Sequence, residues 1–443
     1  MAESSPENGL YFLSLELNKV ACFGEKAIID LSNNASWQKW TIILGENGTG
    51  KTTLLQLLSG FEMVESFIND QIQFSPKGIP EKPSNMVLEQ PKDQEALGKV
   101  VATLGNSHGK VETTEKVELL MFGYNCLGTG THLETFLAGF QCYGYGANRL
   151  IGNSTLQESL GSNTESLFYE YATLINAEEW LLQLDYTANV PSEVQQIATR
   201  KRDTIKEVLK QLLTGIDDIR FSPPTLAKML PTVEFHTHLG WATLQQISLG
   251  YKSMLAWIVD FAYRMFERYP LAENPLAEPA VVLIDEIDLH LHPKWQREIF
   301  SFLNDIFPAT QFIVTAHSPL IVQAAPENAN IILLKKDGDH ITIDQNKTAI
   351  QQWRVDQILS SELFNIPQRN VDIEAKLERR KILQARESPS LSELTELKQL
   401  NTFVHSLPQA EAMEDIEARA IIQKAAAIIK ERTASSGNDP VNS

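Results

Sequence analysis

The sequence has few cysteines, no long apolar segment and no excess of basic residues. The three cysteines are an odd number without the spacing of metal ligands, which is typical of reduced thiols in a cytoplasm: Cys22, Cys126 and Cys142. The most apolar helical run is interrupted by Asp260 and Arg264, so the sequence predicts no membrane span. Its first residues are polar and lack the pattern of a secretion signal. We therefore expect a cytoplasmic protein without a membrane partner.

Acidic residues outnumber basic ones by 56 to 38, which gives a formal net charge of −18. Such a surface repels phosphate backbones at long range and argues against broad coating of nucleic acid. The best candidate for a local DNA contact is the basic run Arg200, Lys201 and Arg202, although three bases on one helix also fit a solvated face. The length of 443 residues exceeds what one typical core uses, so we expect two or three structural units.

Hydrophobic periodicity and turn residues divide the chain into four parts. Residues 1–149 contain β-rich segments, a glycine loop and a short helix, and residues 150–232 are predicted to form a helical insertion. Residues 233–345 alternate short apolar strands with a long helix. Residues 346–443 are predicted to be helical, with about the last ten disordered because they are polar and rich in turn formers.

Local patterns add detail to this organisation. The stretch from about 65 to 120 is polar and broken by Pro80, Pro83 and Pro91, so we expect loops and a hairpin there. A capping box of Ser390 and Glu393 predicts the start of a helix in the last part. In the insertion, apolar residues recur at helical spacing and predict one buried stripe: Val194, Ile197, Ile205, Val208, Leu209 and Leu212.

The segment "GENGTGKT", residues 45–52, fits the pattern G-x-x-x-x-G-K-[ST] between a strand and a helix. Its glycines let successive backbone N–H groups face a phosphate, Lys51 reaches the β- and γ-phosphates, and the Thr52 hydroxyl binds Mg²⁺. The alternative is a glycine turn before a helix, but the strand-to-helix context favours nucleotide binding. The candidate nucleotide-binding residues here are Gly45, Asn47, Gly48, Gly50, Lys51, Thr52 and Thr53.

The segment "LIDEIDLHLHPKWQ" places several acids and two histidines directly after an apolar strand. A phosphate loop needs an acid that holds Mg²⁺ through water and a base for the attacking water. Asp285 and Glu286 fit these two roles. The alternative is a zinc or iron site built from Asp288, His290 and His292. The phosphate loop favours the first interpretation, with the histidines in a loop near the nucleotide.

Two further elements occur in the order that such a site requires. Ser248 and Gly250 form a serine–glycine turn before a long helix, where free N–H groups attract an anion, although Ser248 also fits a simple helix cap. His317 follows an apolar strand and is placed to contact the γ-phosphate and the attacking water, the alternative being a buried core histidine.

These four elements, in this order, resemble the ABC-type ATPase heads shared by Rad50, RecF, the OLD family and related bacterial defence ATPases. The spelling "DEIDLHLHPKWQREI", with "GYGANR" upstream and "WRVDQILSSELF" downstream, is most similar to the ATPase subunits of Septu and retron-associated antiphage systems. The resemblance covers roughly residues 10 to 370. It implies an α/β fold, an ABC-ATPase head with a mixed sheet flanked by helices, carrying the helical insertion and the helical tail.

The resemblance also implies a site and a mechanism. Two heads would pair head to tail around ATP and Mg²⁺, so that Ser248 and Gly250 of one chain complete the site of the other. Glu286 and His317 would be catalytic, and the loop carrying His290 and His292 would touch the opposite subunit. The spelling "ISLGY" departs from the transporter form LSGGQ. A glutamine that helps to hold Mg²⁺ is not obvious, and Gln141 is the candidate.

The implied activity is ATP hydrolysis in the service of a partner. The last part of the chain shows no cluster of carboxylates on strands, so we expect no nuclease activity in this chain. By resemblance, the nucleotide state would control a partner nuclease of HNH type, and DNA or a retron reverse transcriptase with its msDNA stays open as a further partner. The alternatives are a DNA-repair ATPase of the Rad50 or RecF sort, which would need a long coiled coil or a basic channel, and a transporter ATPase.

Overall fold

A computed structural model describes the chain between residues 9 and 406, apart from short internal segments. The segments left out are 25, 34–35, 69–70, 77–97, 108–110, 123–124, 130–139, 154, 157–161, 214, 227–228, 347–352, 362, 365–370 and 387–389. The chain divides into two compact units, Met1–Ile366 and Pro367–Ser443. The predicted disordered last residues lie outside the described part.

The first unit is built on a six-stranded mixed sheet in the order β11-β17-β18-β5-β19-β20. All neighbours are parallel except the β19–β20 hairpin at the edge. The strands are β5 (Trp40–Gly45), β11 (Cys142–Tyr145), β17 (Ala280–Ile284), β18 (Thr310–Thr315), β19 (Asn330–Asp337) and β20 (His340–Asn346). The strands β17 and β18 are buried along their whole length, as parallel strands covered on both faces must be.

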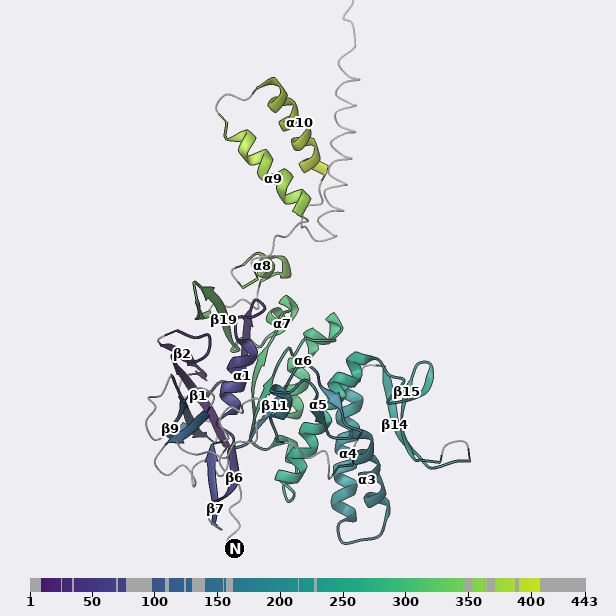
Figure 1. The fold of residues 1–443 in the computed structure, drawn as a ribbon. Helices are drawn as coiled ribbons and strands as arrows, with labels where there is room; N and C mark the ends of the chain where they lie inside the picture. Colours follow the sequence, from purple (N-terminus) through teal and green to yellow (C-terminus); the bar gives the residue numbers. More distant parts are fainter. Residues whose placement is uncertain are drawn as a thin grey trace, which may run out of the picture. The chain divides into compact units, whose positions relative to one another are not determined.

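Alternate residues of these strands supply two separate cores. Ile42 and Ile284 pack in one core with helices of one face, whereas Ile43 and Leu283 pack in the other. Helix α1 (Lys51–Ser59) contributes to the second core, and Figure 1 shows the helices around the sheet. The first core is completed by α5 (Leu249–Arg268), α6 (Pro293–Ile306) and α7 (Pro319–Ala324). Helix α8 (Val355–Ser360) follows the sheet.

An antiparallel sheet, β10-β9-β8-β1-β2, covers α1 and the second core. Its strands are β1 (Gly9–Asn18), β2 (Ala27–Asp30), β8 (Gly98–Ser107), β9 (Val111–Phe122) and β10 (Asn125–Thr129). The β1–β2 pair agrees with the β-rich segments predicted for residues 1–149. The long strands β8 and β9 replace part of the expected loops. Val100 and Leu104 are buried on one face of β8, so the prolines of residues 77–97 interrupt the sequence but not these strands.

Between the halves of the head lie two helices and a small sheet. Helices α3 (Ala177–Asn189) and α4 (Gln195–Leu212) form an antiparallel pair whose buried faces join the first core. Four residues of the predicted stripe are buried, but Val194 and Ile197 are exposed because they lie in the first turn, beyond the reach of the core. The strands β14 (Ile216–Ser222), β15 (Thr232–Thr237) and β16 (Gly240–Thr243) follow as a projecting sheet (Figure 1). Of these, β14 lies within residues 150–232, which were predicted to be helical.

The remaining elements complete the first unit. They are β3 (Ser32–Asn33), β4 (Ser36–Trp37), β6 (Met63–Ile68), β7 (Gln71–Pro76), β12 (Leu150–Ile151), β13 (Thr173–Leu174) and the one-turn helices Glu165–Leu167 and Pro275–Ala277. The β6–β7 pair is a hairpin, as expected for part of that region. Among the described helices, none has both the length and the apolarity needed to cross a membrane.

The second unit is a helical hairpin of α9 (Val371–Gln384) and α10 (Leu391–Ser406). The predicted capping box is confirmed, because Glu393 Oε2 accepts from Ser390 N at 2.8 Å while Ser390 Oγ accepts from Glu393 N at 3.3 Å. Arg379 and Glu396 join the two helices through an exposed ion pair at 2.9 Å. Such surface pairs contribute little stability.

Candidate functional site

The phosphate loop connects the end of β5 to the start of α1, as the sequence predicts. Gly50 is the N-cap of α1 with φ 84°, and a Cβ there would approach Cys22 Sγ to 2.5 Å. Only glycine fits this combination of left-handed backbone and close packing. Within the described residues no side chain caps α1, so its first N–H groups are available to an anion at the positive end of the helix dipole.

Lys51 is held over this loop rather than in solvent. Its Nζ donates to Gly45 O at 2.8 Å and to Glu46 O at 2.9 Å, and the residue is only 7% exposed. Burial lowers the pKa of Lys51, an effect opposed by the carboxylates that end the neighbouring strand. A phosphate would replace part of the water that the ammonium has lost, so the arrangement suits a polyanion.

Asp285 directly follows β17 and meets Thr52 across the loop. The Thr52 hydroxyl donates to Asp285 Oδ2 at 2.7 Å, and the Thr315 hydroxyl at the end of β18 donates to Oδ1 at 2.6 Å. The hydroxyl and the carboxylate are oxygen ligands of the kind that Mg²⁺ prefers. Because the two groups already touch, the donor set fits a magnesium ion bound by Thr52 and, through water, by Asp285.

Glu286 lies beside this pair in an unusual backbone conformation, with φ 49°. A left-handed non-glycine residue costs of order 1 kcal/mol, and such strain is common at functional sites. Its backbone N–H donates to Thr315 Oγ1 at 2.7 Å. Its carboxylate Oε1 lies 3.8 Å from His317 Nε2, and both side chains are about one-third exposed. The predicted base and the predicted histidine therefore face each other at the edge of the site.

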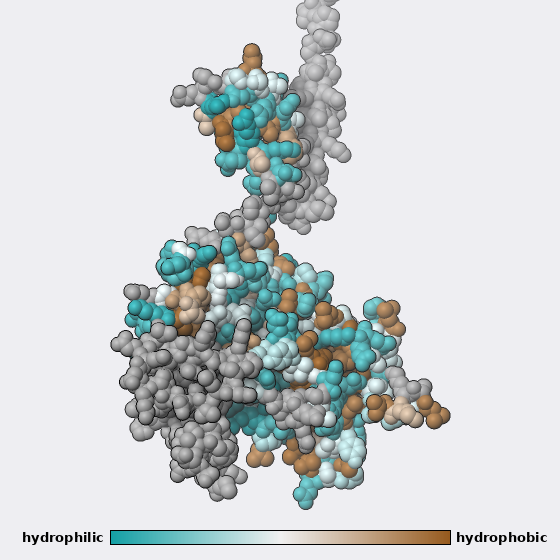
Figure 2. Space-filling model, in the orientation of Figure 1, coloured by the Kyte–Doolittle hydropathy of each residue, from teal (hydrophilic) through white to brown (hydrophobic). Residues whose placement is uncertain are grey.

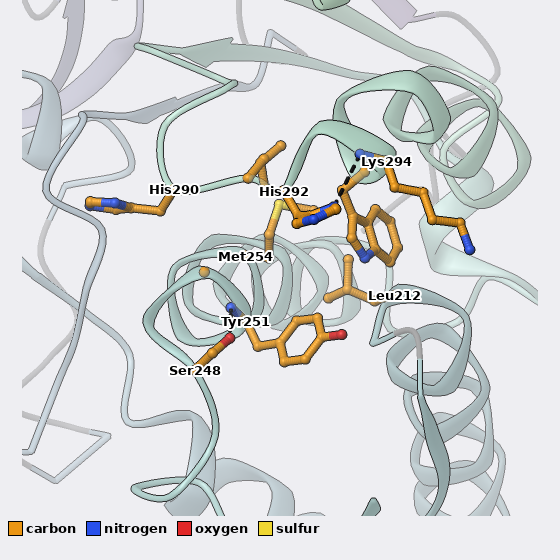
Figure 3. Close-up of a pocket in the computed structure, with 10 residues that line it drawn as sticks. Leu212, Ser248, Tyr251, Met254, His290, His292 and Lys294 are labelled. Carbon is orange, nitrogen blue, oxygen red and sulfur yellow. Dashed lines mark hydrogen bonds between the residues drawn. The ribbon is translucent and has the colours of Figure 1, made fainter. Parts of the chain in front are cut away.

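Asp288 supports the segment that carries His317. The His317 backbone N–H donates to Asp288 Oδ2 at 3.1 Å. His292 Nδ1 accepts from Lys294 N at 3.3 Å and caps α6, while His290 points away from it (Figure 3). The three side chains thus have separate surroundings, and within the described residues no group of three or more His, Cys, Asp or Glu side chains could hold a metal ion. This placement argues against the zinc or iron alternative.

Arg149 also belongs to the site, although no role was predicted for it. In the sequence it is the last residue of the segment "GYGANR", which only marked a resemblance. It ends the turn after β11, is 5% exposed, and its Nη2 donates to the carbonyl oxygens of Asp285 and, at 2.8 Å, of Glu286. Thr315 was not among the predicted site residues either. It ends the strand next to the one that precedes the acidic pair, and a hydroxyl at that position could have indicated a role in the site.

Gln141, the candidate magnesium ligand, does not reach the site. It precedes β11, and its carbonyl accepts from Val281 N at 3.0 Å, at the opening of β17. The site lies at the other end of these parallel strands, where Asp285 follows β17, about 13 Å away along the strand. Residues at the amino ends of parallel strands face the opposite edge of the sheet, so this placement corrects the assignment.

The serine–glycine turn begins α5. Ser248 is its N-cap, with Oγ accepting from Tyr251 N at 3.4 Å, and a Cβ on Gly250 would approach His290 O to 2.5 Å. Glycine therefore allows the turn to pack on the loop after the acidic pair. The turn opens onto a cavity of about 640 Å³ that it shares with His290 and His292 (Figure 3). In the described part of the chain the lining of that cavity includes no residue of the phosphate loop.

The basic run on α4 is largely engaged within the head. Arg202 pairs with Asp185 at 3.3 Å and with Asp203 at 2.9 Å, and Lys201 Nζ donates to Phe266 O at 3.3 Å. Arg200 is exposed. The run therefore resembles a solvated helix face more than a DNA-binding surface.

Two family models match adjacent parts of the chain. Residues 29–167 match "ABC transporter", and residues 157–323 match "AAA domain, putative AbiEii toxin, Type IV TA system". The first range contains the phosphate loop, and the second contains the serine–glycine turn, the acidic pair and His317.

Several relatives are similar in sequence. The Septu protein PtuA of Bacillus mycoides (strain KBAB4) is 25% identical over 412 residues, which is 89% of this chain and 52% of the relative. The "Retron Ec83 probable ATPase" of Escherichia coli is 41% identical over 38% of this chain and 29% of its own length. The "Retron Vc95 probable ATPase" of Vibrio cholerae serotype O1 biovar El Tor is 37% identical over 30% and 25%, respectively. The alignments span about half the length of PtuA and less of the retron proteins.

Among solved structures, the chain is similar to an SMC head bound to the C-winged helix domain of ScpA, with a TM-score of 0.44, 18% identity and coverage of 76% of this chain and 97% of that one. The chain is thus similar in sequence to ABC and AAA domains, to the Septu protein PtuA and to two probable ATPases of retrons.

Proposed function

We propose that the chain is an ATP-binding and ATP-hydrolysing regulatory subunit of a bacterial antiphage defence complex. In this proposal two heads close head to tail around ATP, and their nucleotide state controls a partner nuclease of HNH type. The observation that carries it is the contact of Thr52 with Asp285 at 2.7 Å beside the facing pair of Glu286 and His317. One polypeptide thereby gathers phosphate, metal and water ligands at one edge of its sheet.

The phosphate loop and its surroundings suit a nucleoside triphosphate. The loop N–H groups and Lys51 would bind the β- and γ-phosphates. A second cavity, of about 980 Å³, is lined by Cys22 and Phe23, which pack against Gly50, and also by two lysines. It has room for the base and ribose next to the phosphate loop.

In this proposal, Glu286 and His317, which lie beside the two magnesium ligands, promote hydrolysis. A magnesium ion, when bound by Thr52 and Asp285, would neutralise charge on the β- and γ-phosphates. Glu286 would accept a proton from the attacking water as the water oxygen bonds to the γ-phosphorus and the bond to the ADP oxygen breaks. His317 is near enough to Glu286 to orient the same water or the γ-phosphate.

The exposure of the serine–glycine turn supports a site shared between two chains. Ser248 is exposed and Leu249 is 63% exposed, so the turn and the positive end of α5 are accessible to another molecule. The turn lines a different cavity from the phosphate loop of its own chain. A second copy arranged head to tail would bring each turn to the other's γ-phosphate, and hydrolysis would remove the contacts that hold the heads together.

Complementation between two inactive variants tests the composite site. Lys51→Ala removes a phosphate ligand but keeps the turn, whereas Ser248→Arg blocks the turn but keeps the phosphate loop. A mixed dimer contains one intact composite site, so an equimolar mixture should recover about a quarter of the wild-type rate. Each variant alone should be inactive. An inactive mixture of folded, exchanging variants would refute the head-to-tail arrangement.

The partner requires a separate experiment. An HNH-type nuclease encoded in the same operon should co-purify with this chain, and its DNA cleavage should change between ATP and ADP; an operon without such a nuclease would contradict this part of the proposal. This chain alone should leave DNA intact. If the chain cleaves DNA alone, or binds it with the strong salt dependence of phosphate contacts, the repair-type alternative would replace the proposal.

A further inference from the structure

Arg149 lies behind the acidic pair, where no substrate reaches it. Strands β11 and β17 are parallel, with Asp285 N donating to Tyr145 O at 2.8 Å, so the turn after β11 lies beside the acidic pair. Arg149 extends from this turn, and its Nη2 is shared by the carbonyls of Asp285 and Glu286. A positive side chain thus binds the backbone of both acids rather than their carboxylates.

The guanidinium has no carboxylate of its own among the described residues. Its Nε and Nη1 are buried without a hydrogen-bond partner in that part of the chain. Burial lowers the pKa of Arg149 to about 10, against the opposing influence of the nearby acids, so it stays charged at neutral pH. An arginine kept for stability alone is usually paired with an acid when it is buried. Its placement here is better explained by the backbone it holds.

The backbone conformation of Glu286 requires support from its surroundings. Glu286 has the left-handed φ of 49°, and both of its backbone polar groups are bound by side chains. Its N–H donates to Thr315 Oγ1 at 2.7 Å, and its carbonyl accepts from Arg149 Nη2 at 2.8 Å. A strained conformation persists only where more than one contact with the surroundings imposes it. The two contacts form such a clamp and direct the Glu286 carboxylate toward His317.

We infer that Arg149 is a positioning residue for the hydrolytic step, which clamps Glu286 in the conformation that aims its carboxylate at the attacking water. The inference rests on the proposed function and adds a role that the phosphate loop does not supply. Arg149 lies outside the phosphate loop and does not contact Lys51 or Thr52 through any hydrogen bond found in the described residues. Its loss should therefore affect turnover far more than ATP binding.

The test compares Arg149→Met and Arg149→Lys with wild type in the full-length protein. We expect kcat to fall about 10- to 100-fold in Arg149→Met, while the Kd for ATP changes less than about threefold. Arg149→Lys, which keeps a charge and a donor, should recover part of kcat. Arg264→Met, at a mostly buried arginine that does not contact the acidic pair in any hydrogen bond of the described residues, shows how much turnover is lost through destabilisation. An equal loss of ATP affinity and kcat in Arg149→Met would overturn the inference.

A double-mutant cycle with Glu286→Gln separates positioning from a general effect. If Arg149 acts through Glu286, Arg149→Met should lower the residual rate of Glu286→Gln by less than about twofold. The full reduction in both backgrounds would contradict the inference.

A crystal structure of Arg149→Met gives a readout that does not depend on hydrolysis. The Glu286 φ should leave the left-handed region, and an unchanged backbone would refute the clamp. A wild-type protein without ATPase activity would instead contradict the proposed function, whatever this structure showed.

Discussion

At the scale of single residues, the site is defined by hydroxyls and carboxylates that meet from distant parts of the chain. Thr315 has two roles, because its hydroxyl donates to Asp285 at 2.6 Å and accepts from Glu286 N at 2.7 Å. Both contacts are at the end of β18, one strand away from the acids. Neither depends on a ligand, so they organise the site before nucleotide arrives.

Thr315→Val should damage both stability and turnover. Losing a buried bond to a charged acceptor costs about 1.5–3 kcal/mol, and kcat should fall about tenfold or more as Glu286 loses its support. Thr310→Val on the same strand is the matched control, because the buried Thr310 Oγ1 has no partner within the described residues. Urea denaturation and ATPase assays measure the two effects. Equal losses in the two variants would contradict the assigned role.

Lys51→Ala should abolish nucleotide binding. The ammonium would make charge-assisted bonds to the phosphates, each of which contributes about 1.5–3 kcal/mol, so the Kd for ATP should rise about 100-fold or more. Lys210→Ala changes a partly exposed lysine on α4, which pairs with Glu207 away from the phosphate loop, and serves as the control. Equilibrium binding of a fluorescent ATP analogue measures the difference, and equal affinities would reject the phosphate loop as the site.

The residues that could be predicted from the sequence are those in short, contiguous patterns. Lys51, Thr52, Asp285 and Glu286 follow from spacing and from the strand before them. Arg149 could not be assigned a role in this way, because its contacts form only when β11 pairs with β17, more than a hundred residues later.

At the scale of elements, α5 is tied to β11 by a buried polar network. Asp260 is fully buried, and its Oδ2 accepts from Tyr145 Oη at 3.0 Å and from Arg264 Nε at 2.7 Å. Its Oδ1 accepts from Ile175 N at 3.1 Å. The helix that begins with the serine–glycine turn is thereby fixed to the strand whose turn carries Arg149.

This network predicts a graded stability series. Tyr145→Phe removes one hydrogen bond and should cost about 1–3 kcal/mol, whereas Arg264→Met leaves Asp260 as an uncompensated charge and should cost about 3–5 kcal/mol. Chemical denaturation followed by circular dichroism measures both. A cost below 1 kcal/mol for Arg264→Met would contradict the assigned role of the Asp260–Arg264 pair in stabilising the head.

Helices and strands could be predicted where the hydrophobic periodicity covered the whole element and turn residues marked its ends. The stripe of α4 was found, but its first turn carries Val194 and Ile197 into solvent, because the core covers only the later turns. The strands β8 and β9 were missed because the prolines before them dominated the local pattern. The prediction that Gln141 binds magnesium was wrong for a different reason. Its position next to a site motif gives no information on which end of the strand it occupies.

At the scale of the whole molecule, the first unit carries two main cores of its own. Among the described residues, every buried member of these cores lies before position 364. The exposed apolar residues of the head gather in part on the projecting β14–β16 sheet and its loops (Figure 2): Leu226, Met229, Leu230 and Leu239.

Removal of residues 367–443 should leave the head folded. The melting temperature and the ATPase rate should stay close to those of the full chain, because none of the described residues of the two main cores is removed. Control of the partner nuclease should be reduced if this unit transmits the nucleotide state. Differential scanning calorimetry and a coupled ATPase assay check the first part, and a head that fails to fold would show that the two units depend on each other.

The last consequence concerns the trapped state of the proposed dimer. Glu286→Gln keeps the size and the backbone contacts of the residue but cannot accept the water proton, so ATP should bind and persist. Two heads would then stay closed, and light scattering should report twice the mass of one chain with ATP and a smaller share of dimer with ADP. Adding Lys51→Ala to the same chain should prevent this shift, because the triphosphate that joins the surfaces no longer binds. An ATP-independent dimer in both variants would separate assembly from nucleotide binding, and hydrolysis could then no longer serve as the switch.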